Sequence, residues 1–80
     1  MFNAQVDLQA DAIYISLRAM PTPIAYAKEL DDDRIIDYNI NDEPIGIDLH
    51  NISIGVETDD LPARAQVEEV LKQRGIKIFA

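Results

Sequence analysis

Asp37, Asp48 and His50 are the residues of this 80-residue chain whose types and spacing suit acid–base chemistry. Two carboxylates act as acid and base when burial or repulsion separates their pKa values, and histidine is the usual general base near neutral pH. No serine or cysteine nucleophile motif and no glycine-rich phosphate loop accompanies them. We therefore expect these side chains to lie on the solvated face of a sheet, and we assign no catalytic residue.

Asp31, Asp32 and Asp33 offer three oxygen ligands of the kind that Ca²⁺ and Mg²⁺ prefer. Consecutive side chains of an extended chain point apart, so three neighbours converge on one ion only in an unusual loop. We interpret the run as a solvated turn before a strand. The sequence therefore predicts no metal site and no cofactor.

The charge balance of the chain limits its partners. Seven Lys and Arg residues face fifteen Asp and Glu residues, which gives a formal net charge of −8. This charge repels phosphate backbones and removes the electrostatic attraction that dominates nucleic-acid binding, so we expect no nucleic-acid partner. A basic protein would be attracted. Solubility alone explains the same charge.

The composition fits one globular domain over residues 1–80, since 48% of the residues are hydrophobic and 28% are charged. No apolar run approaches the roughly 20 residues of a membrane span. The N-terminus MFNAQVDLQAD lacks the basic and apolar regions of a secretory signal. We expect a soluble, cytoplasmic protein without membrane association.

Short alternations of apolar and polar residues dominate the first 50 positions. In AIYISL, for example, Ile13, Ile15 and Leu17 share one face and Tyr14 and Ser16 share the other, which is the period of a half-buried strand. Strands are predicted over residues 12–17, 24–30, 34–40 and 44–50, with FNAQV at residues 2–6 as a fifth.

A two-residue turn is predicted at Asn41 and Asp42, because both residue types tolerate left-handed backbone conformations. Pro44 should then be the first residue of the next strand, where its missing N–H costs no ladder hydrogen bond. The resulting register predicts four cross-strand pairs: Tyr38 opposite Ile45, Ile36 opposite Ile47, Asp37 opposite Gly46, and Ile35 opposite Asp48.

The period changes to that of a helix over about residues 60–74, with apolar residues such as Val67 and Leu71 at helical spacing. Asp59 and Asp60 are the expected N-cap, and Gly75 is expected to close the C-terminal end. The following IKIF either adds a short strand or rests against the helix. The expected fold is α+β, an antiparallel β-meander of four to five strands in residues 1–56 with the helix and tail in residues 57–80.

One predicted sheet face must take a helix, either its own or that of a neighbouring subunit. The other face mixes Tyr14, Ile35, Asp37 and Asp48, and such a mixture suits a protein interface as well as a wetted surface. A domain of this size has a marginal core and, lacking cysteine, has no disulfide to support it. We therefore expect a homodimer that functions by binding, with a small enzyme or ligand-binding domain as the alternative.

Two blocks of the sequence resemble a known family. VDLQADAIYISL is similar to the family's block of a tyrosine or valine, an aspartate, a short turn, Ala-Asp and an Ala-Leu-Tyr-Ile-like strand. ELDDDRIIDYNINDEPIGIDLHNIS is similar to its Glu-Val-Asp-Asp-Gly, Ile-Leu-Asp-Tyr and Gly-Ile-Glu-Ile sequence. The family is the domain of unknown function 2283, and the resemblance covers about residues 4–53. The matching positions are Asp7, Asp11, Ala12, Tyr14, Glu29, Asp37, Tyr38 and Gly46.

The resemblance implies a small bacterial protein with no assigned activity. It implies no mechanism. Some members are associated with small genes suspected to encode toxins, which is a hint of partnership with another protein. Asp33 and Asp42 stand where the family commonly carries glycine, so we expect these aspartates to adopt turn conformations at some strain.

Overall fold

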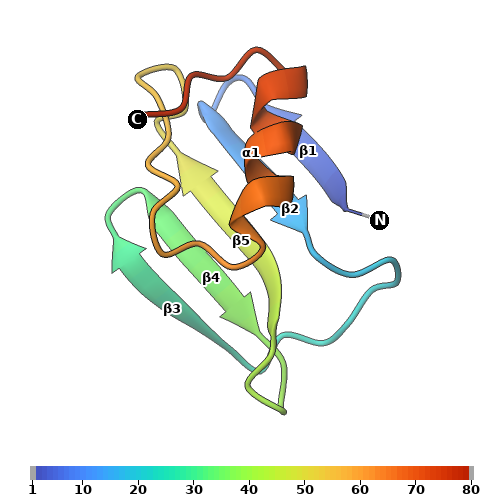
Figure 1. Cartoon of the computed structure of the whole chain (residues 1–80). Coiled ribbons are helices and arrows are strands. Elements are labelled where there is room, and N and C mark those ends of the chain that lie inside the picture. Colours follow the sequence, from blue (N-terminus) through green and yellow to red (C-terminus); the bar gives the residue numbers. More distant parts are fainter. Residues whose placement is uncertain (1, 80) are drawn as a thin grey trace.

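The computed structural model describes residues 2–79 and contains one sheet and one helix (Figure 1). The elements are β1 (Asn3–Asp7), β2 (Ala12–Ser16), β3 (Tyr26–Asp31), β4 (Arg34–Tyr38), β5 (Pro44–His50) and α1 (Arg64–Gln73). The predicted α+β class, with antiparallel strands followed by a C-terminal helix, is confirmed. Pro44 begins its strand, as expected.

The five strands lie in the order β1-β2-β5-β4-β3, and every neighbouring pair is antiparallel. β1 and β2 form a hairpin, while β3, β4 and β5 form a three-stranded meander. The two units join where β2 pairs with β5, so the chain between β2 and β3 crosses to the far edge of the sheet (Figure 1). β5 is the central strand, and Ile45, Ile47 and Leu49 on its inner face are all buried.

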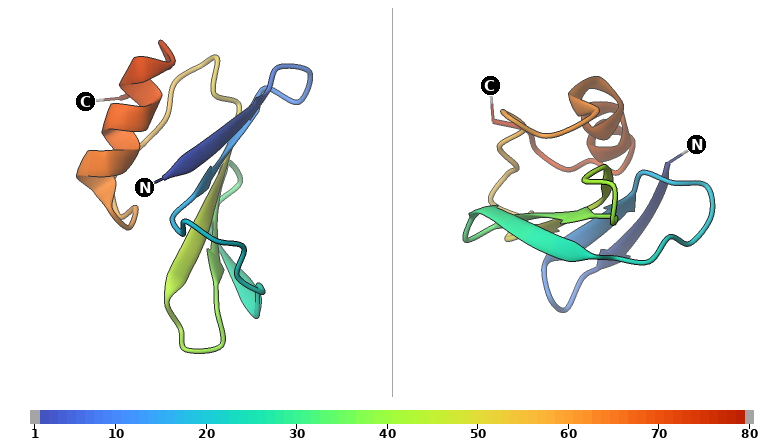
Figure 2. Two further views of the ribbon diagram at one scale, coloured as in Figure 1. Left: turned by 90° about the vertical axis from the view of Figure 1, so that its right-hand side faces the viewer. Right: turned by 90° about the horizontal axis from the view of Figure 1, so that it is seen from below.

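Helix α1 packs on the sheet of its own chain and forms a second layer over one face (Figure 2). Val67 and Leu71, one turn apart, are fully buried. Burial of one such aliphatic side chain contributes about 1.5–3 kcal/mol to folding. The buried core beneath and around the helix consists of Ile13, Ile15, Ile47, Leu49, Ile52, Val56, Leu61, Val67 and Leu71.

The predicted two-residue turn between β4 and β5 is wrong. The chain turns through residues 39–43, and the register shifts between Asp37 and Tyr38, so Tyr38 lies opposite Pro44 instead of Ile45. Asn39 organises this longer loop, because its side-chain oxygen accepts hydrogen bonds from the backbone N–H groups of residues 41 and 43. Asp42 has φ 62° there, the left-handed conformation expected of it.

The other three predicted pairs between these strands are confirmed: Asp37 with Gly46, Ile36 with Ile47, and Ile35 with Asp48. The outer ends of the predicted alternations are wrong. Ile24 precedes β3 and Ile40 lies in the 39–43 loop, with 56% and 84% of their surfaces exposed. Neither residue belongs to a strand, so the period of two no longer decides which way its side chain points.

Tyr26 and Tyr38 lie on the same side of the sheet as the helix but beyond the core that the helix covers. Their rings stack with centroids 5.0 Å apart and planes 10° apart. The Tyr26 hydroxyl also donates a 2.7 Å hydrogen bond to Asp42. This contact joins the β3 edge to the 39–43 loop.

The predicted start of the helix is wrong by about four residues. The N-cap is Ala63, with a left-handed φ of 51° and no side-chain cap, and neither Asp59 nor Asp60 takes that place. Pro62 disfavours a helical conformation at Leu61, and the left-handed backbone of Ala63 separates Pro62 from the first helical residue, Arg64. Gly75 has φ 70° and closes the C-terminal end, as predicted.

The C-terminal tail returns to the segment before the helix. Ile78 forms a parallel bridge with Val56, whose N–H and carbonyl bond to residues 77 and 79. Ile76 and Ile78 also pack against the core. The IKIF segment was predicted either to add a short strand or to rest against the helix. It does part of each, because it forms a single bridge and packs against the core.

Candidate functional site

The face of the sheet opposite α1, here called the open face, brings the predicted interface residues together. The register places Asp48 of β5 opposite Tyr14 of β2 on one side and opposite Ile35 of β4 on the other. Asp37 lies opposite Gly46, diagonal to Asp48. All four predicted residues are therefore neighbours, and each is half-buried.

Gly46 allows Tyr14 to reach across the central strand. The Tyr14 hydroxyl donates a 2.9 Å hydrogen bond to Asp37 Oδ2, which joins β2 to β4 over β5. A Cβ atom at position 46 would lie 1.8 Å from the Tyr14 oxygen, so a larger residue cannot share this position with the tyrosine as it lies. The absence of a side chain at Gly46 creates the space for this contact.

The environment of Tyr14 keeps its hydroxyl protonated. Burial, the hydrogen bond to Asp37 and the negative charges of Asp37 and Asp48 raise the pKa of Tyr14 to about 12. Each of these causes disfavours the phenolate, because burial removes water from its charge and that charge would be a third negative charge beside two carboxylates. Tyr14 is therefore a hydrogen-bond donor at neutral pH.

Asp48 pairs with His50, the next residue along the same face of β5. The distance from Asp48 Oδ2 to His50 Nε2 is 3.1 Å, and both side chains are about one-third exposed. The two predicted aspartates therefore have different polar partners, a tyrosine for Asp37 and a histidine for Asp48. This arrangement differs from a carboxylate pair that shares one proton.

The open face is strongly acidic. Among the described strand residues on it are Asp7, Glu29, Asp37 and Asp48, together with His50 and without any Lys or Arg. The charge is also divided along the chain. Residues 1–63 hold thirteen of the fifteen acidic residues and three of the seven basic residues. Residues 64–80 hold the other two acidic residues and the other four basic residues.

A broad, open groove of about 820 Å³ runs along this face beside the β1–β2 hairpin. Gln5, Tyr14, Asp48 and His50 contribute its polar wall, and the turn of the hairpin contributes apolar atoms from Leu8 and Ala10. Such a groove presents an aromatic ring, a carboxylate and an imidazole to whatever lies in it. These groups suit a cationic side chain, through both charge and the ring face.

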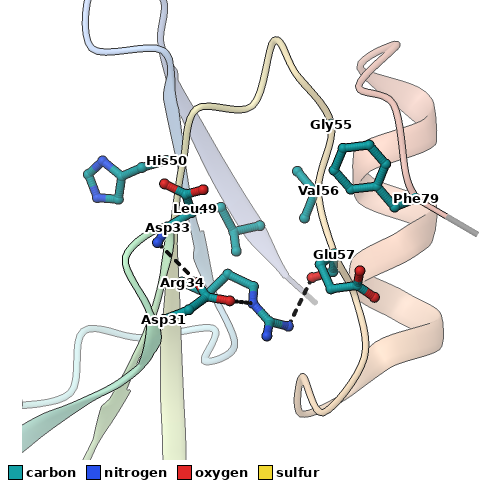
Figure 3. Close-up of a pocket in the computed structure, with 9 residues that line it drawn as sticks. All are labelled: Asp31, Asp33, Arg34, Leu49, His50, Gly55, Val56, Glu57 and Phe79. Atoms are coloured by element: carbon teal, nitrogen blue, oxygen red, sulfur yellow. Dashed lines mark hydrogen bonds and ion pairs between the residues drawn. The ribbon is translucent and has the colours of Figure 1, made fainter.

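A second, smaller cavity of about 70 Å³ lies on the helix side of the sheet, between the β3–β4 turn and the segment before α1 (Figure 3). Arg34 occupies it. Its guanidinium bonds to Asp31 Oδ2 at 2.9 Å and to the carbonyls of Glu57 and Asp59 at 3.1 and 2.6 Å. His50 points away from this cavity (Figure 3). These contacts make the cavity a structural junction, because Arg34 ties the turn to the loop that leads into the helix.

The three consecutive aspartates diverge, as expected of a turn. Asp31 accepts hydrogen bonds from the Asp33 N–H and from Arg34, and these lower the pKa of its carboxyl. Asp33 instead accepts a 2.7 Å bond from the side chain of Asn51. Within residues 2–79, no group of three or more His, Cys, Asp or Glu side chains is placed to hold a metal ion.

Two further side chains form structural hydrogen bonds that were not predicted from the sequence. Asp11, with a left-handed φ of 52°, accepts bonds from the Ser53 backbone N–H at 3.0 Å and from its hydroxyl at 2.6 Å. Thr58 is fully buried and donates a 2.6 Å bond to Glu68 of the helix. A signal existed for Arg34, which falls in the inward register of Ile36. The sequence marks Asp11 through its resemblance to the family pattern, and no comparable signal marks Thr58.

Within the described part of the chain, no helix is both long and apolar enough to cross a membrane.

Comparison with known families matches residues 5–53 to the family described as protein of unknown function (DUF2283). The match runs from the middle of β1 to the residues just after β5 and leaves α1 outside. Neither the search of curated proteins nor the search of solved structures found a significant match. Because the family match covers more than half of the chain, the protein belongs to the DUF2283 family.

Proposed function

We propose that this protein is a non-catalytic interaction module, acting as a homodimer, whose open face binds and restrains a basic protein partner. The observation that carries the proposal is the position of Asp37 and Asp48, which both lie beside Tyr14 on a sheet face that α1 leaves uncovered. A toxin-antitoxin-like pairing fits this description, since one acidic chain would neutralise a basic one.

The chemistry of the face supports a cationic side chain as the contact. Tyr14 remains a neutral donor, because its pKa is about 12, and its ring offers an aromatic surface beside two carboxylates. Arginine binds carboxylates through paired hydrogen bonds and stacks on aromatic rings. The hydrophobic contribution comes from Ile35, which is half-buried next to Asp48.

The test compares two doubly substituted proteins of equal charge as bait in native lysate. Asp37→Asn with Asp48→Asn removes the charges of the open face, whereas Asp32→Asn with Asp60→Asn removes two exposed charges elsewhere. We expect the wild type and the control variant to retain a basic protein at low salt. The open-face variant should not retain it. High salt should elute this basic protein from the wild type and the control, since screening weakens exposed charge pairs.

Equal retention by both variants would contradict the role of the open face. Recovery of no basic protein by the wild type would contradict the proposal as a whole. The retained protein is then purified, and its affinity for the wild type and for both variants is measured by calorimetry. An affinity at least about tenfold lower for the open-face variant, a loss of about 1.4 kcal/mol, supports direct contact.

The groove beside the hairpin favours a second candidate, binding or turnover of a small molecule. The observation is the 3.1 Å contact between Asp48 and His50 at the wall of a groove of about 820 Å³. A carboxylate that orients a histidine is a common arrangement around a general base. A reproducible turnover that His50→Gln abolishes, with the melting temperature unchanged, would replace the binding proposal by this one.

A further inference from the structure

The two edges of the sheet differ in how well they are protected from pairing with another strand. Edge strands expose unpaired N–H and carbonyl groups, and natural proteins protect them with charged side chains, prolines or bulges. β3 has two of these protections. It carries Lys28 and Glu29, and its register shifts between Glu29 and Asp31.

β1 at the opposite edge has few of these protections. Its sequence NAQVD contains a single charge, at the last residue, and its pairing with β2 proceeds without a register shift. Figure 1 shows β1 at the margin of the sheet with no strand beyond it. The surrounding apolar surface is exposed, with 41% of Val6 and 86% of Leu8 accessible to solvent.

An apolar hollow lies beside this edge on the helix side of the sheet. It measures about 250 Å³ and is lined by Phe2, just before β1, and by Val70 of α1, with the glutamines at positions 66 and 73 and Glu69 around them. Phe2 and Val70 are only half-buried. The open strand edge and the hollow are neighbours, so one partner can cover both.

We propose that β1 pairs antiparallel with β1 of a second copy, about a two-fold axis that passes beside Gln5. This inference deepens the dimeric part of the proposed function by naming the interface. The product is one continuous sheet of ten strands. A two-fold axis perpendicular to the sheet keeps both helices on one side and joins the two open faces into a single acidic surface.

The sequence of β1 is self-complementary in this register. Pairing centred on Gln5 is the arrangement that uses all five residues of the strand. It sets Asn3 opposite Asp7 of the second copy, so the two Asp7 charges stay at opposite ends. It also sets Ala4 of each copy opposite Val6 of the other, on the helix side and next to the hollow. Two apolar residues therefore face each other on both sides of Gln5.

Salt distinguishes this interface from the binding of a basic partner. Each copy carries a net charge of −8, so two copies repel one another and added salt should strengthen the dimer. Binding of a basic protein by the open face should weaken under the same change. The two parts of the proposed function therefore respond in opposite directions.

Single cysteines test the register, because the chain has no cysteine of its own. Residues directly opposite in an antiparallel pair have Cα atoms about 4.5–5.5 Å apart, which a disulfide can span. Under mild oxidation Gln5→Cys should form a covalent dimer. A mixture of the Asn3→Cys and Asp7→Cys proteins should also form a covalent dimer. Either variant alone should form much less of it. Ala27→Cys, on the β3 edge, is the matched control and should remain uncrosslinked.

Val6→Lys tests the energetics of the same edge. A lysine on an edge strand opposes pairing, so the dissociation constant of the dimer should rise at least about tenfold in sedimentation equilibrium at micromolar concentration. Ala27→Lys places the same residue on the β3 edge and should leave the constant unchanged. A Val6→Lys protein that retains the wild-type circular dichroism spectrum shows that the change acts on assembly.

The outcomes separate this proposal from the broader one. A dimer that crosslinks through Ala27→Cys and not through Gln5→Cys would overturn the β1 interface and leave a dimeric function standing. A wild-type protein that is monomeric at all salt concentrations would overturn both the interface and the dimeric part of the function. The open face would then still be tested separately by the charge variants.

Discussion

The inner and open faces of the sheet are built from the same five strands, yet their side chains make different kinds of contact. On the inner face Ile13, Ile15, Ile47 and Leu49 are buried completely or nearly so beneath α1. On the open face, the residues that alternate with them are partly exposed and form polar contacts such as the Tyr14–Asp37 hydrogen bond. The inner face therefore holds the fold together, and most of the polar side chains of the open face remain partly accessible to solvent.

One contact at the centre of the open face is structural. Tyr14, Gly46 and Asp37 form a contact that spans three strands and depends on the missing side chain at Gly46. All three residues lie within residues 5–53, the segment that matches the family. At this point the open face combines a structural contact with the proposed binding surface.

The largest expected effect is on the inner face. Ile47→Ala should lower the free energy of unfolding by about 2–5 kcal/mol, because it removes a fully buried side chain of the central strand and leaves a cavity. Ile36→Ala, which is also buried opposite Ile47, should cost a similar amount. Chemical denaturation measures both. A loss below about 0.5 kcal/mol would contradict the assignment of the core.

The next effect is at Gly46. Gly46→Ala should destabilise the protein by about 1–3 kcal/mol, because the added Cβ would collide with the Tyr14 ring and hydroxyl and force them to move. The control is a double-mutant cycle with Tyr14→Ala, read from denaturation midpoints. In that background alanine at 46 should be neutral or stabilising. Equal costs in the two backgrounds would show that the tyrosine is not the obstacle.

Much of the strand architecture could be predicted from the period of the side chains. Ile36, Ile47, Asp37 and Asp48 lie on the faces and in the registers that the period predicts, because burial on one face makes a slip of one residue costly. The shared face of Tyr14 and Ile35 follows from the same period. The prediction is wrong where the chain leaves the sheet, as at Ile40, because side-chain direction there depends on local loop hydrogen bonds.

Contacts between distant segments could not be predicted in the same way. The order of the strands depends on β2 pairing with β5, and nothing in the sequence of either strand selects the other. The Tyr14–Asp37 bond crosses an intervening strand, and its formation depends on that order. The predicted start of the helix is wrong because Asp59 resembles a cap, whereas it pairs with Arg64 at 3.0 Å and its carbonyl binds Arg34.

The ionisation of Tyr14 sharpens the account of the open face. Because burial and the bond to Asp37 raise its pKa to about 12, an alkaline absorbance titration should show a tyrosine that ionises near that pH and that Tyr14→Phe removes. The folded state holds this proton more tightly than the unfolded chain, whose tyrosine pKa is about 10. The contribution of Tyr14 to stability is therefore complete below pH of about 10 and is lost as the pH rises toward about 12. A titration that is unchanged by Tyr14→Phe would contradict the contact.

The smallest expected effect on stability is at the charged groups of the open face. Asp37→Asn, Asp48→Asn and His50→Ala should each change the free energy of unfolding by no more than about 0.5 kcal/mol, because all three side chains are partly exposed. In the Asp37→Asn variant, the amide would still offer an oxygen to the Tyr14 hydroxyl. Thermal denaturation of the three variants at neutral pH measures these changes.

Stability and binding should respond differently to the loss of these charges. If the carboxylates serve recognition, a substitution that leaves the unfolding curve in place should still weaken the complex with a basic partner at least about tenfold. If instead Asp37→Asn costs as much stability as Ile47→Ala, the open face would be a second structural face, and its charges would need no partner to explain them. The same pair of measurements thus decides whether the acidic side chains of the sheet belong to the fold or to the interface.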